Sequence, residues 1–142
     1  MATEFNRLGF RFLYPENWKL EVDETTGWPR SVSVYSPSGA MWSVTADSVP
    51  VEDLQERIAD AICAEYEEVE REPIERLVGD AKLKGIELSF YCLDFLVVAQ
   101  VLACPGTDRP TVILLQGESR DFEALGQVFD AISFSYLQAR PN

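Results

Sequence analysis

Three acidic side chains at helical spacing, Glu52, Glu56 and Asp60, form the most regular charged pattern of this sequence. Residues four apart lie on the same side of a helix, so these carboxylates stack along one ridge, opposite Leu54 and Ile58. Two interpretations follow. The ridge is either a solvated helix face that helps to keep the protein in solution, or a docking site that attracts a basic protein partner electrostatically.

The negative charge of the chain is concentrated around this ridge. The 142 residues include 12 Lys and Arg and 24 Asp and Glu, for a net charge of −12. Residues 51–80 hold 3 of the basic and 11 of the acidic side chains, and therefore two-thirds of the net charge. Nucleic-acid binding depends on clustered Lys and Arg, so this balance argues against a nucleic-acid partner.

A tryptophan in a polar loop is the second candidate contact. Trp28 lies in residues 23–29, whose composition is typical of a loop. It either folds back onto the sheet as an anchor, as most large aromatic side chains do, or stays exposed as a contact residue of the type enriched at binding hot spots. The remaining tryptophans, Trp18 and Trp42, follow strand patterns and are expected in the core.

The sequence offers little for catalysis. It contains no histidine, which removes Ser-His-Asp and Cys-His chemistry and histidine-ligated zinc. No glycine-rich phosphate loop or nucleophile elbow occurs, and we predict no metal site and no cofactor. Adjacent carboxylates such as Glu67 and Glu68 point apart on a strand.

These observations predict a non-enzymatic binding or adaptor module that contacts a protein partner, a basic one if the acidic ridge is its docking site. The alternative is a small-ligand carrier, or an enzyme that uses carboxylates in a sheet-lined pocket. A deep apolar cavity with convergent polar groups would favour that alternative. A third possibility is a subunit whose exposed sheet edge pairs with another chain.

The cysteines and the N-terminus bear on the compartment. Cys63, Cys92 and Cys104 cannot all pair within one chain and show no CxxC spacing, so we expect reduced, buried thiols. Residues 1–8 lack the basic and apolar regions of a signal peptide, and no apolar run reaches 18 residues. The expected protein is cytoplasmic, without membrane association, and a monomer or weak homodimer.

Hydrophobic periodicity defines the elements that position these residues. Alternating apolar side chains predict an antiparallel meander of strands, and a helical period follows it. The expected strands are 8–14, 18–22, 32–34, 41–46, 67–71, 81–93, 95–104 and 111–115, and the expected helices are 51–65 and 122–132. Ser119 or Asp121 is expected to cap the second helix, within which Gly126 suggests close packing on the sheet.

Most connections between these strands are too short for a parallel crossover, so the pairing is predicted to be antiparallel. The expected fold is α+β, a single domain over residues 1–142 in which an antiparallel sheet is flanked by helices as an α/β/α sandwich.

Two stretches resemble a known family. Residues 10–18, FRFLYPENW, look like the opening F-x-F-x-Y-P-x-x-W strand and turn of the Mog/PsbP-like proteins. Residues 111–136, a strand, a short turn and an amphipathic helix, are similar to the end of those chains. The resemblance implies an antiparallel sheet between helices and an accessory or binding role, because the family includes a binder of the GTPase Ran and an extrinsic photosystem II subunit. It transfers no partner-binding residue, and the chain lacks histidines for the metal sites of the photosynthetic branch.

Overall fold

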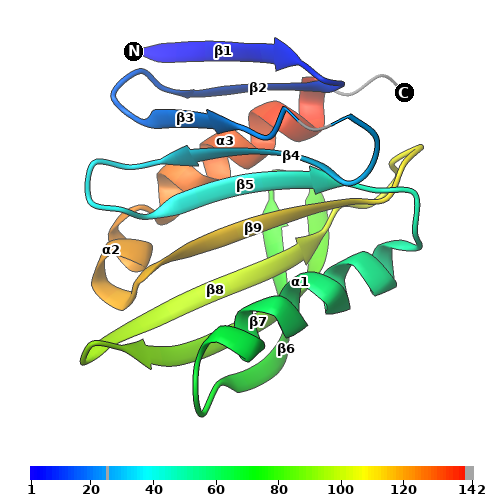
Figure 1. The fold of residues 1–142 in the computed structure, drawn as a ribbon. Coiled ribbons are helices and arrows are strands. Elements are labelled where there is room, and N and C mark those ends of the chain that lie inside the picture. Colours follow the sequence, from blue (N-terminus) through cyan, green and yellow to red (C-terminus); the bar gives the residue numbers. More distant parts are fainter. Residues whose placement is uncertain (25, 140–142) are drawn as a thin grey trace.

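A seven-stranded antiparallel sheet forms the centre of the protein. The computed structural model describes residues 1–24 and 26–139, so Thr25 of the predicted loop lies outside the described residues. The strands within this part are β1 (Ala2–Arg7), β2 (Phe10–Pro15), β3 (Lys19–Val22), β4 (Arg30–Tyr35), β5 (Met41–Ala46), β6 (Glu70–Val78), β7 (Ala81–Cys92), β8 (Phe95–Ala103) and β9 (Thr111–Glu118). The helices within the same part of the chain are α1 (Val51–Glu65), α2 (Ser119–Ala124) and α3 (Gly126–Ala139). The large sheet has the order β3-β4-β5-β9-β8-β7-β6 (Figure 1).

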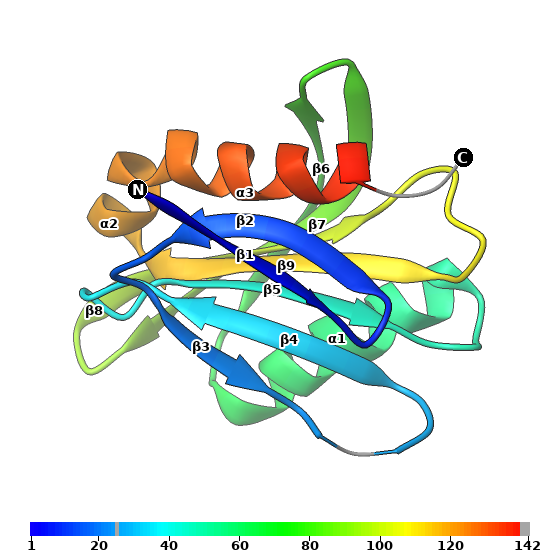
Figure 2. The same ribbon diagram turned by 90° about the horizontal axis from the view of Figure 1, so that it is seen from above.

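Helices cover both faces of this sheet. Helix α1 packs on β7, β8 and β9 from one side. Helices α2 and α3 lie on the opposite side together with the β1–β2 hairpin (Figure 2). The predicted α+β fold, an antiparallel sheet flanked by helices, is confirmed.

The N-terminal strands depart from the predicted meander. Strand β2 pairs with β1 rather than with β3, so the two form a separate hairpin. Strand β1 was not predicted, because Phe5 is the only buried side chain in its six residues. Phe5 stacks on Phe12 with 5.3 Å between ring centroids, and the backbone N–H of Leu13 donates to Ser135 Oγ at 2.9 Å. The β1–β2 hairpin therefore packs in the same layer as α3, on one face of the large sheet.

Two further boundaries were predicted wrongly. Strand β6 runs over Glu70–Val78 instead of 67–71, and the second helix is divided into α2 and α3. Neither expected residue caps α2: the Glu118 side chain accepts from the Asp121 backbone N–H. Gly126 begins α3, and a Cβ placed there would meet only the Arg76 guanidinium at 4.0 Å. The expected close packing of Gly126 on the sheet is therefore wrong.

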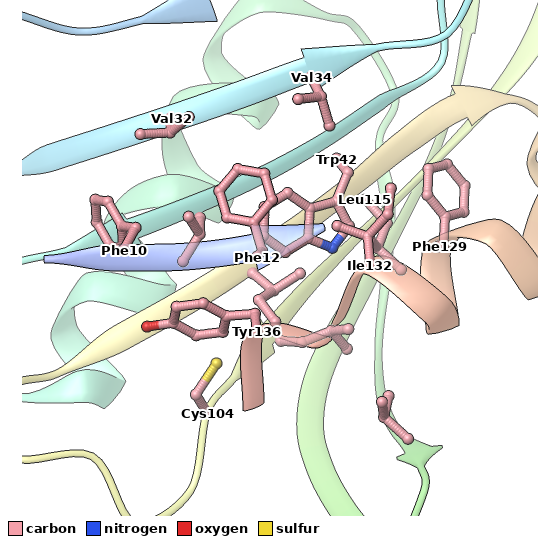
Figure 3. Packing of buried hydrophobic residues seen from close by; sticks show 14 of the residues in the cluster. Phe10, Phe12, Val32, Val34, Trp42, Cys104, Leu115, Phe129, Ile132 and Tyr136 are labelled. Atoms are coloured by element: carbon pink, nitrogen blue, oxygen red, sulfur yellow. The ribbon is translucent and has the colours of Figure 1, made fainter. Parts of the chain in front are cut away.

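The larger core lies between the sheet and α3. Trp42 is fully buried there, 4.7 Å from Phe12 between ring centroids (Figure 3). Its Nε1–H donates to Ser133 Oγ at 2.9 Å, and that hydroxyl donates to the Phe129 carbonyl at 2.8 Å. The indole thus contributes a large apolar surface while its one polar group has a partner.

Helix α1 forms the smaller core on the other face. Glu52 and Asp53 lie in its first turn, where negative charge is favourable near the positive end of the helix dipole. Leu54 and Ala59 are buried against the sheet. The Gln55 side-chain amide donates to backbone carbonyls of β7 and β8 at 3.1 and 2.8 Å. The predicted helix 51–65 is confirmed; Leu54 and Ile58 pack inward as expected, whereas the buried residue Ala59 was not predicted.

Candidate functional site

The predicted acidic ridge lies on the exposed side of α1. Glu52, Glu56 and Asp60 are all exposed. Arg71 of β6 pairs with two of them, donating to Glu56 and, at 3.0 Å, to Asp60 Oδ1. Its hydrogen bonds to Asp60 and Glu56 raise the pKa of the Arg71 guanidinium above its usual value. A cation of the same chain thus offsets part of the negative charge of the ridge.

The sequence pattern did not reveal this pairing, because Arg71 belongs to a different element from the ridge. Docking of a basic partner on Glu52, Glu56 and Asp60 stays a prediction.

Trp28 lies at the rim of a pocket. It is 39% exposed, whereas Trp18 and Trp42 are 7% and 0% exposed, as expected of core residues. The guanidinium carbons of Arg30 and Arg109 lie 4.4 and 3.8 Å from its ring centroid. Such cation–π contacts hold the side chain in place without burying it. Trp28 is therefore neither a core anchor nor a freely projecting contact.

The β7–β8 turn carries exposed apolar side chains that the sequence patterns did not reveal. Tyr91, Leu93 and Phe95 are 69%, 88% and 62% exposed. The strands pair up to Cys92 and Phe95, so the turn is tight. Leu93 and Asp94 adopt φ values of 49° and 70°, a conformation that hairpin turns usually give to Asn and Gly. The sequence did contain a signal for these exposed side chains. Apolar residues flank Asp94, and the two-residue turn contains neither glycine nor asparagine.

An acidic groove adjoins this turn. It has a volume of about 540 Å³ and is lined by Glu67, Glu68, Val69, Glu70, Ser89, Phe90, Tyr91 and Leu96. Tyr66 stacks on Phe90 with 4.1 Å between ring centroids, which anchors the segment that supplies the glutamates. None of these three glutamates forms an ion pair within residues 1–24 and 26–139.

Exposed apolar and acidic side chains therefore lie at the same end of the sheet, and Tyr91 lines the acidic groove. We call the set Tyr91, Leu93, Phe95, Glu67, Glu68 and Glu70 the hairpin patch.

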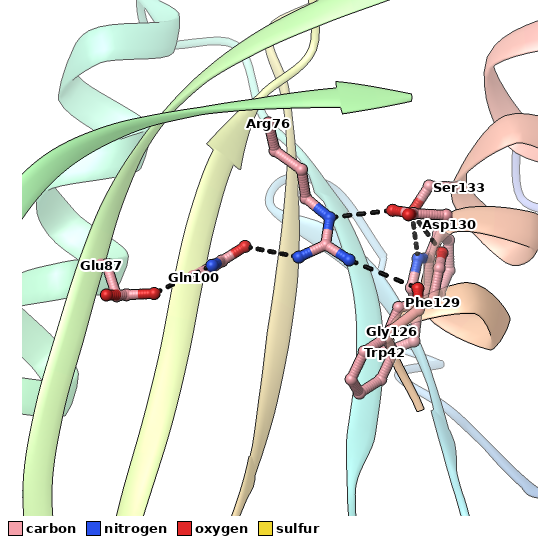
Figure 4. A network of polar contacts seen from close by, with 8 residues as sticks. All are labelled: Trp42, Arg76, Glu87, Gln100, Gly126, Phe129, Asp130 and Ser133. Carbon is pink, nitrogen blue, oxygen red and sulfur yellow. Dashed lines mark hydrogen bonds and ion pairs between the residues drawn. The ribbon is translucent and has the colours of Figure 1, made fainter. Parts of the chain in front are cut away.

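A polar network accounts for other carboxylates near the sheet. Arg76 Nε donates to Asp130 at 2.8 Å, and Arg76 Nη1 donates to the Gln100 side-chain oxygen at 3.0 Å. The Gln100 amide nitrogen donates to Glu87 at 2.9 Å (Figure 4). A third contact, at 3.3 Å, joins Arg76 Nη2 to the Gly126 carbonyl. This chain of contacts joins β6, β7 and β8 to α3, which is a structural role.

The outer strands of the large sheet have features that oppose pairing with another chain. Strand β6 contains Pro73, which cannot donate a backbone hydrogen bond, among charged residues. Strand β3 has only four residues, and its exposed members are Lys19 and Glu21. Short, charged and proline-containing strands are common protections of sheet edges. They reduce the support for the sheet-edge alternative.

The burial of the cysteines differs from the expectation. Cys104 is buried, whereas Cys63 and Cys92 are half-buried, so the prediction of three buried thiols is wrong for two of them. In the described part of the chain, no group of three Cys, Asp or Glu side chains is placed to hold a metal ion. The longest helix among the described residues, α1, has 15 residues, fewer than a membrane-spanning helix needs.

Comparison with solved structures defines the class of fold. The cyanobacterial PsbP protein CyanoP of Synechocystis sp. PCC 6803 is similar with a TM-score of 0.57 and 16% identity, over 94% of this chain and 90% of that one. PA94 of Pseudomonas aeruginosa, described as a protein of unknown function, is similar with a TM-score of 0.53 and 9% identity, over 99% of both chains. No family model and no curated protein matches the sequence.

The predicted PsbP-like architecture is thus confirmed as a fold. At these identities the similarity concerns the fold, and function must be argued from the surfaces of this chain.

Proposed function

We propose that the protein is a non-enzymatic binding module whose hairpin patch contacts a protein partner. The observation that carries the proposal is that three exposed apolar side chains lie at the same end of the sheet as three glutamates that lack an ion pair among the described residues, with Tyr91 beside the glutamates in the groove. Burial of an apolar side chain of this size contributes about 1.5–3 kcal/mol, so the turn can supply the main contacts of an interface.

The charge of the patch indicates the chemistry of the partner. Glu67, Glu68 and Glu70 surround the groove, and carboxylates at an interface select a partner of opposite charge and speed its approach. The partner is a protein surface that presents Lys or Arg beside a pocket or groove for apolar side chains. Glu52, Glu56 and Asp60 extend the negative potential along the helix that leads into the groove.

A library of random displayed peptides tests the proposal, and it does so even while the natural partner is unidentified. Peptides selected on the protein are expected to combine Lys or Arg with Leu or Phe. The double variant Leu93→Ser/Phe95→Ser should bind them about tenfold or more weakly, as expected from loss of a hot spot. The matched control is Leu77→Ser, because Leu77 is 66% exposed on β6 but lies away from the turn.

Three results would contradict the proposal. These are a selection that enriches no peptide, enriched peptides without basic residues, and peptides that bind the double variant as tightly as the unchanged protein.

A further inference from the structure

A pocket of about 190 Å³ lies at the end of the sheet opposite the hairpin patch. The β1–β2 turn, the beginnings of β4 and β9 and the connection between β8 and β9 contribute to its walls. Phe10 and Ala46 are among its buried lining residues, whereas Trp28, Asp108 and Arg109 are exposed at its rim. Buried aromatic and aliphatic side chains are thus combined with a charged entrance.

Two arginines reach this entrance without a carboxylate partner among the described residues. Arg30 and Arg109 are absent from the ion pairs formed there. Stacking on Trp28 occupies a face of each guanidinium, while the N–H groups point outward in its plane. The Arg30 Nε–H makes a 3.4 Å contact with the Gly27 carbonyl, and the planar forks of both side chains can still donate to a ligand.

The backbone holds Arg109 in position. The Thr111 hydroxyl donates to the Arg109 carbonyl at 2.9 Å. The Asp47 N–H donates to the Pro110 carbonyl at 3.0 Å, and the Cys104 N–H donates to the Thr111 carbonyl at 3.0 Å. These bonds close the base of the connection between β8 and β9. The guanidinium is therefore presented from an anchored segment, with Trp28 restricting its orientation.

The size of the pocket limits the ligand. Cavities of about 150 Å³ accommodate benzene, whereas sites for drug-sized ligands usually exceed about 300 Å³. We propose that this pocket binds a small organic anion, a carboxylate or phosphate monoester whose body is about one ring in size. The charged group accepts hydrogen bonds from Arg30 and Arg109, and the ring packs against Phe10 and Ala46. This site is separate from the hairpin patch and does not depend on the proposed function.

Four probes test separately the contribution of the charged group and that of the ring. Each probe is titrated into the folded protein at constant ionic strength. They are phenyl phosphate, benzoate, its uncharged analogue benzamide, and inorganic phosphate. The readout is the indole N–H signal of Trp28 in a two-dimensional NMR spectrum, assigned with a Trp28→Phe variant, together with the amides of residues 106–109.

Phenyl phosphate or benzoate should shift these signals saturably, and the tighter of the two identifies the preferred charged group. Benzamide and inorganic phosphate should each bind about tenfold or more weakly, because one lacks the charge and the other lacks the ring. Arg30→Gln and Arg109→Gln should each weaken binding about tenfold, and Arg109→Lys less, because it keeps the charge but loses the planar fork.

Arg120→Gln is the matched control, since Arg120 is also exposed and forms none of the ion pairs between described residues, but lies in α2 outside the pocket. The Arg120→Gln variant should bind the probes with the same affinity as the unchanged protein. The proposal is overturned if no probe gives a saturable shift, if benzamide binds as tightly as benzoate, if inorganic phosphate equals phenyl phosphate, or if Arg120→Gln weakens binding as much as Arg109→Gln.

Discussion

The two ends of strand β8 carry opposite chemistry. Phe95, at its beginning, belongs to the apolar and acidic hairpin patch, whereas the chain beyond Ala103 leads into the pocket rimmed by Arg30 and Arg109. Nine residues of strand span about 30 Å, several times the screening length of about 8 Å at physiological salt. The two ends therefore attract their ligands independently, and a net charge of −12 conceals a local cationic site.

The two regions also differ in how the chain builds them. The hairpin patch comes from two short stretches, residues 67–70 and 91–95, whereas the pocket assembles five segments that are distant in sequence. A patch made of neighbouring residues can be altered without disturbing the rest of the sheet. The pocket depends on the packing that brings those five segments together.

The largest effect should follow truncation of a side chain in the core between the sheet and α3. We expect Trp42→Ala to lower the free energy of unfolding by about 3–5 kcal/mol, because it leaves a cavity and deprives Ser133 of its donor. Tyr91→Ala, at an exposed position of the hairpin patch, should change it by less than about 0.5 kcal/mol. Urea denaturation measures both. Equal losses would contradict the division between core and surface.

A smaller loss should follow from breaking the polar network around Arg76. Arg76→Met removes contacts to Asp130, Gln100 and Gly126 and should cost about 2 kcal/mol, because Gln100 is left buried with an unmatched acceptor. Denaturant unfolding is again the measurement. The matched control, Arg120→Met, should be nearly neutral. A loss no greater than that of the control would show that the network does not stabilise the fold.

The β7–β8 turn should gain stability when its residues are replaced by the preferred ones. Leu93→Asn/Asp94→Gly places favoured residues at the positive φ values, so the free energy of unfolding should rise by about 1 kcal/mol. Thermal unfolding reports the change, and peptide binding to the hairpin patch should fall in the same variant. A gain in stability with unchanged peptide binding would show that Leu93 is not part of the contact surface.

The smallest effect concerns the charge at the entrance of the pocket. Asp108 opposes an incoming anion, so Asp108→Asn should tighten benzoate binding about threefold, the scale of one exposed charge interaction. Glu68→Gln at the far end should leave that affinity unchanged, because the distance exceeds the screening length. Calorimetric titration compares the two variants. An equal gain in both would mean that net charge, rather than local charge, controls binding.

Sequence patterns predicted more of the fold than of the binding surfaces. Period-two and helical patterns located β7, β8 and α1, because each of these elements buries one regular face. They missed β1, whose only buried residue is Phe5. The division of the second helix was also missed, since it depends on a local cap at Glu118.

The candidate site was harder to predict because it depends on contacts between elements. Trp28 was a candidate contact residue, but its position beside Arg109 arises from folding, which joins positions far apart in the chain. Arg71 likewise reaches the α1 ridge only through the placement of β6. The hairpin patch was missed because Tyr91 and Phe95 fit a buried-strand pattern, and only the end of the pairing at the turn exposes them.

One NMR experiment tests whether the two ends of the sheet are separate binding sites. A selected basic peptide and phenyl phosphate are added to the protein singly and then together. We expect peptide shifts in residues 66–70 and 89–96, anion shifts in residues 28–30 and 106–109, and unchanged affinity of each in the presence of the other. Peptide shifts at the pocket, or competition between the two ligands, would contradict it.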